Sequence, residues 1–445
     1  MSLKASLISI FTILSLFFGL WASAIDLQEQ KYKADNFTFV AKQTVQDGIK
    51  KFIFESELGE PVVQADVGQR VVVAIENQLS QPFTIDFHGI KFSDIAFEKD
   101  EANPFLIAPN QTKSFVFTLS QQGTFWFHPT YDQHNLLDMG LYGAIVVNSP
   151  KIKIPADREF LFFVDDAYLN KTNQIVSEIQ YSEKDVENFK RIYQFNWQDS
   201  IQIKTPKNSL LRMHLINTSR TQTFVLEAEK LTFLILGYDI GFLTQPHQAQ
   251  KVMIPPGSRL DVLLFVDGDF NSYPLYNYTF DKKHRIGEIA VVGSITSREA
   301  DYLSLKNSKL NLQFDSYDNK KPKRDYELQI KEKRGKRWIV WKSKWTKYPS
   351  GAKKFRLQKG EFYKLRIINK TSTLHPIQIV NQNLSLIFRG GFRTYKNWGY
   401  RDGFLLMPLE VVIVGFVAQA DGEWMTNTSF SQFNSKNIGD LIQIK

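Results

Sequence analysis

The sequence predicts an all-β protein built from three β-sandwiches. Short runs rich in β-branched and aromatic residues, such as "RVVVAIENQL" and "KSFVFTLS", are separated by Gly, Pro, Asn and Asp, a pattern typical of antiparallel strands joined by turns. No long stretch has helical periodicity, and the best helical candidate, residues 183–192, is brief. A chain of 445 residues is also too long for one hydrophobic core and fits two or three domains.

One strand-and-turn pattern recurs along the chain. A strand that runs into an Asn is present in each copy, at residues 70–78, 210–219 and 363–372. Each copy continues with a second apolar strand and a turn that contains Pro. Three copies of one sandwich account for the length of the chain. We therefore expect domains at residues 25–152, 153–300 and 301–445.

The first 24 residues have the composition of a secretory signal peptide. A short segment with Lys4 precedes an apolar stretch, residues 7–21, and the small residues Ala22, Ser23 and Ala24 follow it. We expect cleavage after Ala24; an uncleaved membrane anchor is the alternative. No twin-arginine pair precedes the apolar stretch, which favours the general Sec route of export.

The chain contains no cysteine. Exported eukaryotic proteins of this size usually carry disulfides, so the predicted location is the bacterial periplasm. No later segment reaches transmembrane length, so we expect no membrane span in the mature chain. The net charge of +9 is spread along the chain and falls well short of a nucleic-acid footprint, so no nucleic-acid partner is expected.

Basic and aromatic residues alternate around Gly335, which predicts a hairpin in the third sandwich. Trp338, Trp341 and Trp345 are interleaved there with lysines and Arg337. Two interpretations are open. The tryptophans form an adhesive basic-aromatic face for an envelope protein or a lipid surface, or they pack inward while the lysines stay in water.

Several segments together point to a known family. They are "FTIDFHGI", "GTFWFHPT" followed by "MGLYGAIVV", "LRMHLINTS" with "IPPGSRLDVLL", "STLHPIQIV", and a closing segment that begins "YRDGFLLMPLEVV". In order and spacing they resemble the multicopper oxidases, and the resemblance covers nearly all of residues 25–445. It implies three cupredoxin-like Greek-key β-sandwich domains.

The resemblance also shows which copper ligands the first domain has kept. In the family's first His-x-His motif, Asp86 stands in the place of the leading histidine and only His88 remains. The second motif keeps His128 but has Thr130 in the place of its partner. Both surviving histidines match ligand positions of the family's three-copper cluster.

The third domain has lost nearly all of its ligands. His375 remains from the family's His-Pro-x-His-x-His motif, while Gln378 and Val380 replace the other two histidines. The His-Cys-His motif is replaced entirely, by Asn427, Thr428 and Ser429, and Phe433 lies near the expected downstream histidine. A blue-copper site requires a Cys thiolate. Because the chain has none, oxygen reduction by the family mechanism is excluded, and we expect no copper cofactor.

The remnant in the first domain has two interpretations. Period-two alternation puts Asp86 and His88 on the same side of one strand, and His128 is expected to approach them. These three residues would form a two-histidine, one-carboxylate site suited to Fe(II), Zn or Cu(II). Alternatively, the two histidines are interior groups that only satisfy hydrogen bonds.

The other candidate ligands are expected to have structural roles. His134, Asp138 and Met139 would bind copper weakly or lie in a solvated loop, and the loop is the favoured interpretation. His375 lacks a thiolate partner, so we expect it to support the Leu374–His375–Pro376 bend. Three further histidines match no ligand position, namely His214, His247 and His284.

The resemblance is greatest to a copper-free branch of the family, typified by the periplasmic cell-division protein FtsP, also called SufI. It implies a non-catalytic periplasmic scaffold that binds envelope or division proteins and supports division or envelope integrity. The basic hairpin and the groove between domains are the expected interfaces. The alternative from another class is a mononuclear metal-binding protein, or a metal-dependent oxidoreductase, that uses Asp86, His88 and His128.

Overall fold

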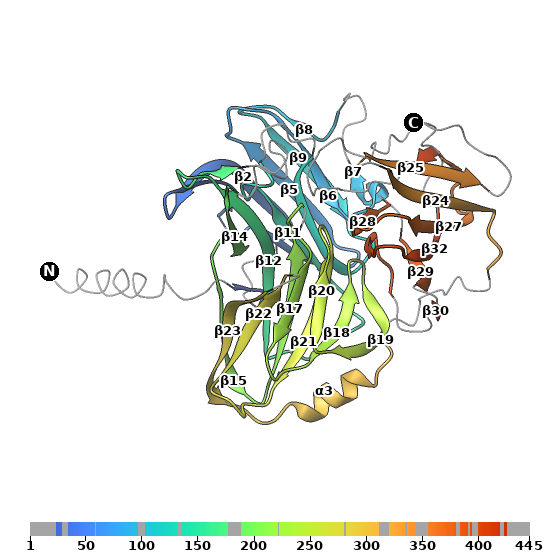
Figure 1. Ribbon diagram of the computed structural model, residues 1–445. Helices are drawn as coiled ribbons and strands as arrows, with labels where there is room; N and C mark the ends of the chain where they lie inside the picture. Colours follow the sequence, from blue (N-terminus) through green and yellow to red (C-terminus); the bar gives the residue numbers. More distant parts are fainter. Residues whose placement is uncertain are drawn as a thin grey trace.

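The computed structural model describes residues 24–28, 34–57, 59–96, 103–130, 136–176, 188–220, 222–279, 282–310, 320–333, 336–343, 355–379, 383–389, 392–393, 399–418 and 422–424. The chain is all-β, as predicted, and its strands form β-sandwiches (Figure 1). The signal-peptide prediction falls on residues outside those described, apart from Ala24. Within the described part of the chain, no helix has the length and hydropathy needed to cross a bilayer.

The first sandwich consists of two five-stranded sheets, ordered β4-β11-β10-β6-β8 and β3-β2-β5-β9-β7. Its strands are β2 (Asn36–Gln46), β3 (Ile49–Ser56), β4 (Val62–Asp66), β5 (Arg70–Asn77), β6 (Phe83–His88), β7 (Ile95–Ala96), β8 (Leu106–Ile107), β9 (Thr112–Thr118), β10 (Gly123–Thr130) and β11 (Gly143–Asn148). A 3-10 turn, Phe92–Asp94, precedes β7. Phenylalanines fill the core: the Phe127 ring lies 5.1 Å from Phe54 and 5.2 Å from Phe39, between centroids.

The second sandwich pairs an eight-stranded sheet with a five-stranded one. The larger has the order β1-β12-β16-β21-β18-β19, with β13 and β14 also paired to β12, and the smaller has the order β15-β23-β22-β17-β20. The elements are β1 (Ile25–Asp26), β12 (Arg158–Leu169), β13 (Ile175–Val176), β14 (Lys190–Phe195), β15 (Ile201–Lys207), β16 (Ser209–Asn217), β17 (Phe224–Ala228), β18 (Phe233–Tyr238), β19 (Phe242–Ala249), β20 (Lys251–Ile254), β21 (Arg259–Val266), β22 (Ser272–Tyr278), β23 (Lys283–Ser294) and α3 (Glu299–Lys306). Thus β1, although first in the chain, joins the second sandwich.

The third sandwich has a six-stranded sheet, ordered β25-β24-β27-β32-β29-β30, and two small sheets, β26-β33 and β28-β31. Its strands are β24 (Arg324–Lys333), β25 (Lys336–Ser343), β26 (Phe355–Leu357), β27 (Phe362–Asn369), β28 (His375–Gln378), β29 (Ser385–Arg389), β30 (Phe392–Arg393), β31 (Gly403–Leu406), β32 (Val411–Val417) and β33 (Gly422–Trp424). The predicted hairpin is present, since β24 pairs with β25 antiparallel.

The repeated Asn is explained by one hydrogen-bonding pattern that occurs in every sandwich. Asn77, Asn217 and Asn369 end β5, β16 and β27 and are fully buried. Each side-chain oxygen accepts the backbone N–H two residues later, and each amide nitrogen donates to two backbone carbonyls. The turn after each strand is therefore held by the same side chain, as expected for an Asx turn.

The brief helical candidate at residues 183–192 is not helical over its described part. Residues 183–187 lie outside the described residues, and Lys190–Phe195 forms β14, paired antiparallel with β12. Tertiary pairing overrides the weak local helical pattern there. Among the described residues the α-helix is α3, which packs Tyr302 and Leu305 on the second sandwich (Figure 1).

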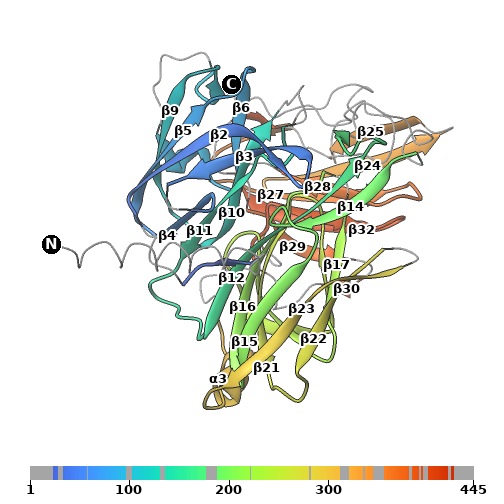
Figure 2. The same cartoon turned by 90° about the vertical axis from the view of Figure 1, so that its left-hand side faces the viewer.

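The three sandwiches meet around a short backbone segment of the second. Ile240, between β18 and β19, forms isolated β-bridges with Gly123 of the first sandwich and with Tyr400 of the third. Apolar residues also join the first two sandwiches, including Trp126, Tyr142, Phe163 and Trp197. Strand β16 is consequently buried along its whole length. Figure 2 shows the three sandwiches from a direction at right angles to that of Figure 1.

Candidate functional site

Strands β6 and β10 position the predicted site. They pair antiparallel, with His128 opposite Asp86 and Trp126 opposite His88. Phe87 and Phe127 alternate with these residues and point into the core of the first sandwich. Because side chains alternate along a strand, Asp86, His88 and His128 emerge together on the opposite face, toward the other two sandwiches.

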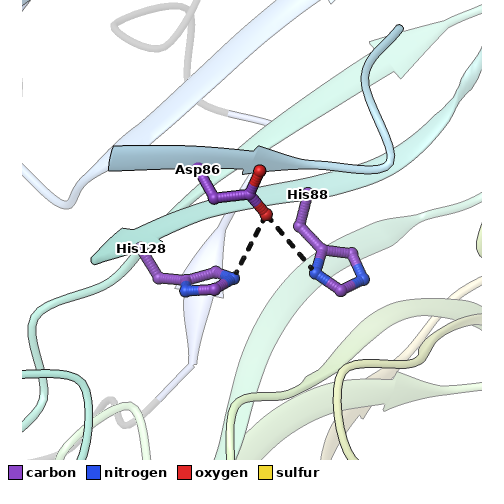
Figure 3. A group of neighbouring side chains, drawn as sticks. All are labelled: Asp86, His88 and His128. Atoms are coloured by element: carbon purple, nitrogen blue, oxygen red, sulfur yellow. Dashed lines mark ion pairs between the residues drawn. The ribbon is translucent and has the colours of Figure 1, made fainter. Parts of the chain in front are cut away.

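These three side chains converge, as the sequence predicted (Figure 3). The Oδ2 atom of Asp86 lies 3.6 Å from Nε2 of His128 and 3.8 Å from Nδ1 of His88. One nitrogen of each imidazole and a carboxylate oxygen all lie within 4.8 Å of one another. Both histidines are buried, whereas 30% of the Asp86 side chain is exposed. The three side chains form a small polar cluster, called the polar recess below, that reaches solvent at Asp86.

The outer nitrogens of the two imidazoles face acceptors. Nδ1 of His128 lies 2.9 Å from the carbonyl oxygen of Pro129, so it carries the proton and donates, and Nε2 directs its lone pair at Asp86. Nε2 of His88 faces Oδ2 of Asp402 at 3.9 Å. The Trp126 ring stacks on His128 at 4.0 Å and holds its plane. The geometry therefore favours tautomers whose lone pairs point inward.

Burial controls the protonation of this cluster. It raises the pKa of Asp86 to about 7, with the charge of Asp402 adding to the effect and Arg259 opposing it. Burial lowers the pKa of His88 well below its usual value, and the charges of Arg259 and His128 lower it further. Burial also lowers the pKa of His128 to about 4. Both imidazoles are therefore neutral at neutral pH.

An ion pair lies on the other side of His88. The Arg259 side chain of β21 is fully buried and donates to both carboxylate oxygens of Asp402, at 3.0 and 2.7 Å. Its Nε donates to the carbonyl oxygen of Thr124 at 2.8 Å. The Asp239 carboxylate lies 3.6 Å from Nη1 and accepts the Arg259 backbone N–H at 2.9 Å. One guanidinium thus connects β10 of the first sandwich, its own second sandwich and the third.

The neighbouring carboxylates and the close approach of the backbone at Gly89 both favour the ion pair of Arg259 with Asp402. Burial works against the charged guanidinium, but Asp402 and Asp239 outweigh it, so the pKa of Arg259 is raised. Gly89 follows His88 with φ +86°, and a Cβ there would lie 2.7 Å from Asp402 Oδ2 and closer still to Arg259 Nη2. Glycine is therefore required where the chain passes the ion pair.

A second polar chain joins the first two sandwiches. His214 shares a 2.8 Å hydrogen bond with the Thr124 hydroxyl and lies 2.8 Å from Glu159 through its other nitrogen. Arg212 donates to Glu159 and, through two nitrogens, to Asp261. A small cavity between the sandwiches is lined by Thr124, Arg212, His214, Arg259 and Asp261, and hydrogen bonds engage both guanidinium groups.

The remaining predicted residues have structural contacts or lie outside the described residues. His375 is fully buried and hydrogen-bonds the Thr371 hydroxyl at 2.6 Å, as expected for a residue that supports a bend. Thr130 donates to the Thr84 carbonyl at 3.4 Å, and Asp138 pairs with Arg220. Gln378 lies in β28, and Trp338 and Trp341 in β25. The following residues fall outside the described part: His134, Trp345, Val380, Asn427, Thr428, Ser429 and Phe433.

Sequence reasoning missed Arg259, Asp402, Asp239 and Thr124. Arg259 and Asp402 both lie in segments that carry the family resemblance, "IPPGSRLDVLL" and "YRDGFLL". The available signal was a charged residue inside an otherwise apolar segment, because such a residue is rarely fully buried without a partner.

Known proteins share this architecture. Residues 41–152 match the family model described as multicopper oxidase. The multicopper oxidase MmcO of Mycobacterium tuberculosis is 31% identical over 108 residues, which are 24% of this chain and 20% of that protein. The iron transport multicopper oxidase fetC of Epichloe festucae is 23% identical over 230 residues, 50% of this chain and 36% of that protein. The chain spans less than half the length of these curated relatives.

Solved structures resemble nearly the whole chain. The McoA multicopper oxidase of Aquifex aeolicus has a TM-score of 0.67 at 15% identity, covering 88% of this chain and 95% of that one. A multicopper oxidase of Campylobacter jejuni, described as a metallo-oxidase, has a TM-score of 0.69 at 17% identity and covers 88% of each chain. The chain therefore has the multicopper oxidase-like cupredoxin fold.

The side chains present do not fit the copper centres of that fold. A blue-copper site needs a thiolate, and the sequence has no cysteine. Beside His88, the ion pair of Arg259 with Asp402 fills the junction between the sandwiches. No step of copper-dependent oxygen reduction can be built on these residues.

Proposed function

We propose that this protein is a non-catalytic scaffold of the bacterial periplasm, a copper-free member of the multicopper oxidase family similar in role to FtsP. It binds envelope or division proteins and supports cell division or envelope integrity. The observation that carries the proposal is Arg259: a protein-borne cation joins the three sandwiches at the surviving copper-ligand positions. Side chains of the protein itself therefore close this junction.

The buried network supports a scaffold because it favours one arrangement of the sandwiches. Although buried ion pairs contribute little net stability, Arg259 has its acceptors Thr124, Asp239 and Asp402 together only in this arrangement. Fixed relative positions allow loops from different sandwiches to present one binding surface, and preorganised surfaces lose less entropy on binding.

The absence of oxidase activity is tested by a copper challenge. The purified mature protein is stripped with chelator, loaded with Cu(II) and assayed for oxygen uptake with a phenolic substrate. We expect neither turnover nor the intense visible absorption of a copper-thiolate centre. Phenol-dependent oxygen uptake that scales with protein concentration would contradict the proposal.

The cellular role is tested by deleting the gene and measuring division and leakage of periplasmic proteins under osmotic and antibiotic stress. We expect elongated or leaky cells that are rescued by the wild-type gene. Rescue by Asp86→Asn as well would show that the role does not require the polar recess. A deletion strain that divides normally and retains its envelope under every stress would contradict the scaffold.

A further inference from the structure

We propose that Asp86, His88 and His128 form a mononuclear binding site for a divalent transition-metal ion, with Zn²⁺ as the best-matched probe. The site is chemically distinct from a copper-oxidase centre because it combines two imidazoles with one carboxylate and no thiolate. The inference goes beyond the scaffold role and does not depend on it.

The spacing of the donors suits one small ion. Zinc binds imidazole nitrogen and carboxylate oxygen at about 2.0–2.1 Å, so donors at tetrahedral corners lie about 3.4 Å apart. The separations from Asp86 to the two histidines, 3.6 and 3.8 Å, exceed this value slightly, and all three donors lie within 4.8 Å of one another. Small side-chain rotations therefore close the set around an ion.

Both imidazoles are oriented by contacts outside the set. Metal-bound histidines usually donate their other N–H to a carbonyl or carboxylate, which fixes the tautomer. Here His128 donates to the carbonyl of Pro129, and His88 turns its outer nitrogen toward Asp402. The stacked Trp126 ring further restricts His128. These contacts hold the inner nitrogens as acceptors before any ion arrives.

A buried acceptor independently points to a ligand. Among the described residues, no group donates a hydrogen bond to Nε2 of His128, although this atom is shielded from solvent. A buried polar atom without a partner is costly and requires an explanation. The lone pair of Nε2 points at the Asp86 carboxylate, and two acceptors facing each other repel unless a cation or a proton lies between them.

The charges around the three ligands favour moderate rather than tight binding of a cation. Asp86 supplies one negative charge, and its 30% exposed side chain gives an ion from solution a route to the recess. Arg259 lies beyond Asp402 and repels a cation, but its guanidinium is neutralised by that carboxylate. Three protein ligands leave a position for water, as in open zinc sites.

The test uses the full mature chain, stripped with chelator and titrated with Zn²⁺ by calorimetry and with Co²⁺ by visible absorption. We expect one ion per chain and a Co²⁺ spectrum typical of four- or five-coordinate nitrogen and oxygen ligands. Asp86→Asn and His128→Gln should each weaken Zn²⁺ binding by at least about 100-fold, a ligand loss exceeding the effect of outer-contact substitutions. Thermal unfolding checks that each variant is folded.

His284→Gln is the matched control. His284 is partly buried in β23 of the second sandwich, in a different sheet from β6 and β10, and hydrogen-bonds Thr279. The His284→Gln variant should bind Zn²⁺ with the same affinity and stoichiometry as the wild type. Absence of stoichiometric binding to folded wild-type protein, or binding unchanged in both Asp86→Asn and His128→Gln, would overturn the site. Neither result affects the deletion phenotype, so failure of the metal site and failure of the scaffold role are distinguishable.

Discussion

Two polar clusters lie on either side of His88, and they differ in how completely the protein satisfies them. Arg259 has hydrogen bonds of 2.7–3.0 Å to Asp402 and Thr124, and its side chain is fully enclosed. The Asp86 cluster has separations of 3.6–3.8 Å and one side open to solvent. A buried charge is tolerated only with full hydrogen bonding. The first cluster is therefore structural, and the second is available to a ligand.

The largest effect is expected from Arg259→Met, which leaves the Asp402 charge buried without its partner. Breaking a buried pair in this way typically costs about 3–5 kcal/mol of unfolding free energy. The measurement is urea unfolding of chelator-treated protein at neutral pH. Arg285→Met is the control, because the Arg285–Glu288 pair is exposed and should contribute less than about 1 kcal/mol. Equal losses of unfolding free energy in the two variants would show that the buried Arg259–Asp402 pair contributes no more than an exposed pair, which would contradict the prediction.

An intermediate effect is expected from Asn217→Ala. The substitution removes two donated bonds and one accepted bond at a fully buried turn, leaving carbonyls of Gln222 and Ile254 without this donor. A loss of about 1–3 kcal/mol is expected, and Asn77→Ala and Asn369→Ala should resemble it. Thermal unfolding of the three variants is the measurement. A large effect at one site and none at the others would show that the repeated turns are not equivalent.

The pH dependence of the Arg259 cluster is set in part by Asp239. Burial, with Asp402 adding to it, raises the pKa of Asp239 to about 6, above its unfolded value of 3.8. The folded state therefore binds this proton more tightly, so its stabilising contribution is complete below pH 3.8 and is lost as pH rises through about 6. Relative to Asp239→Asn, wild-type protein should lose at most about 1.4 kcal/mol per pH unit over that range. If the unfolding free energies of wild type and Asp239→Asn changed in parallel with pH, the raised pKa of Asp239 would be refuted.

The smallest loss of stability is expected from Asp86→Asn in chelator-treated protein. Asp86 has no close hydrogen bond to either histidine, and its pKa of about 7 means that the folded state disfavours the ionised carboxylate, so replacing it with a neutral amide should not lower the unfolding free energy at neutral pH. Adding Zn²⁺ should raise the melting temperature of wild-type protein but not of the variant, because only the native wild type binds the ion. A metal-free variant as unstable as Arg259→Met would remove the contrast between the clusters.

The sequence predicted the local features well. Alternating strands and the recurring Asn follow from neighbouring residues, and the recess followed from the family resemblance and the two-residue period of β6. Arg259 and Asp402 could not be paired in this way, because they are 143 residues apart and lie on different sandwiches. The described part of the brief helical candidate at residues 183–192 belongs to a strand, because β14 gains a partner in β12 that no local pattern reveals.

The central claim is that the ion pair of Arg259 with Asp402 joins the sandwiches beside His88. A double-mutant cycle on Arg259→Met and Asp402→Leu, followed by urea unfolding in chelator, tests it most directly. Each single variant should be strongly destabilised, and the double variant should recover most of the loss, because an apolar pair replaces an ion pair at little cost. Additive losses, with no recovery in the double variant, would contradict the account.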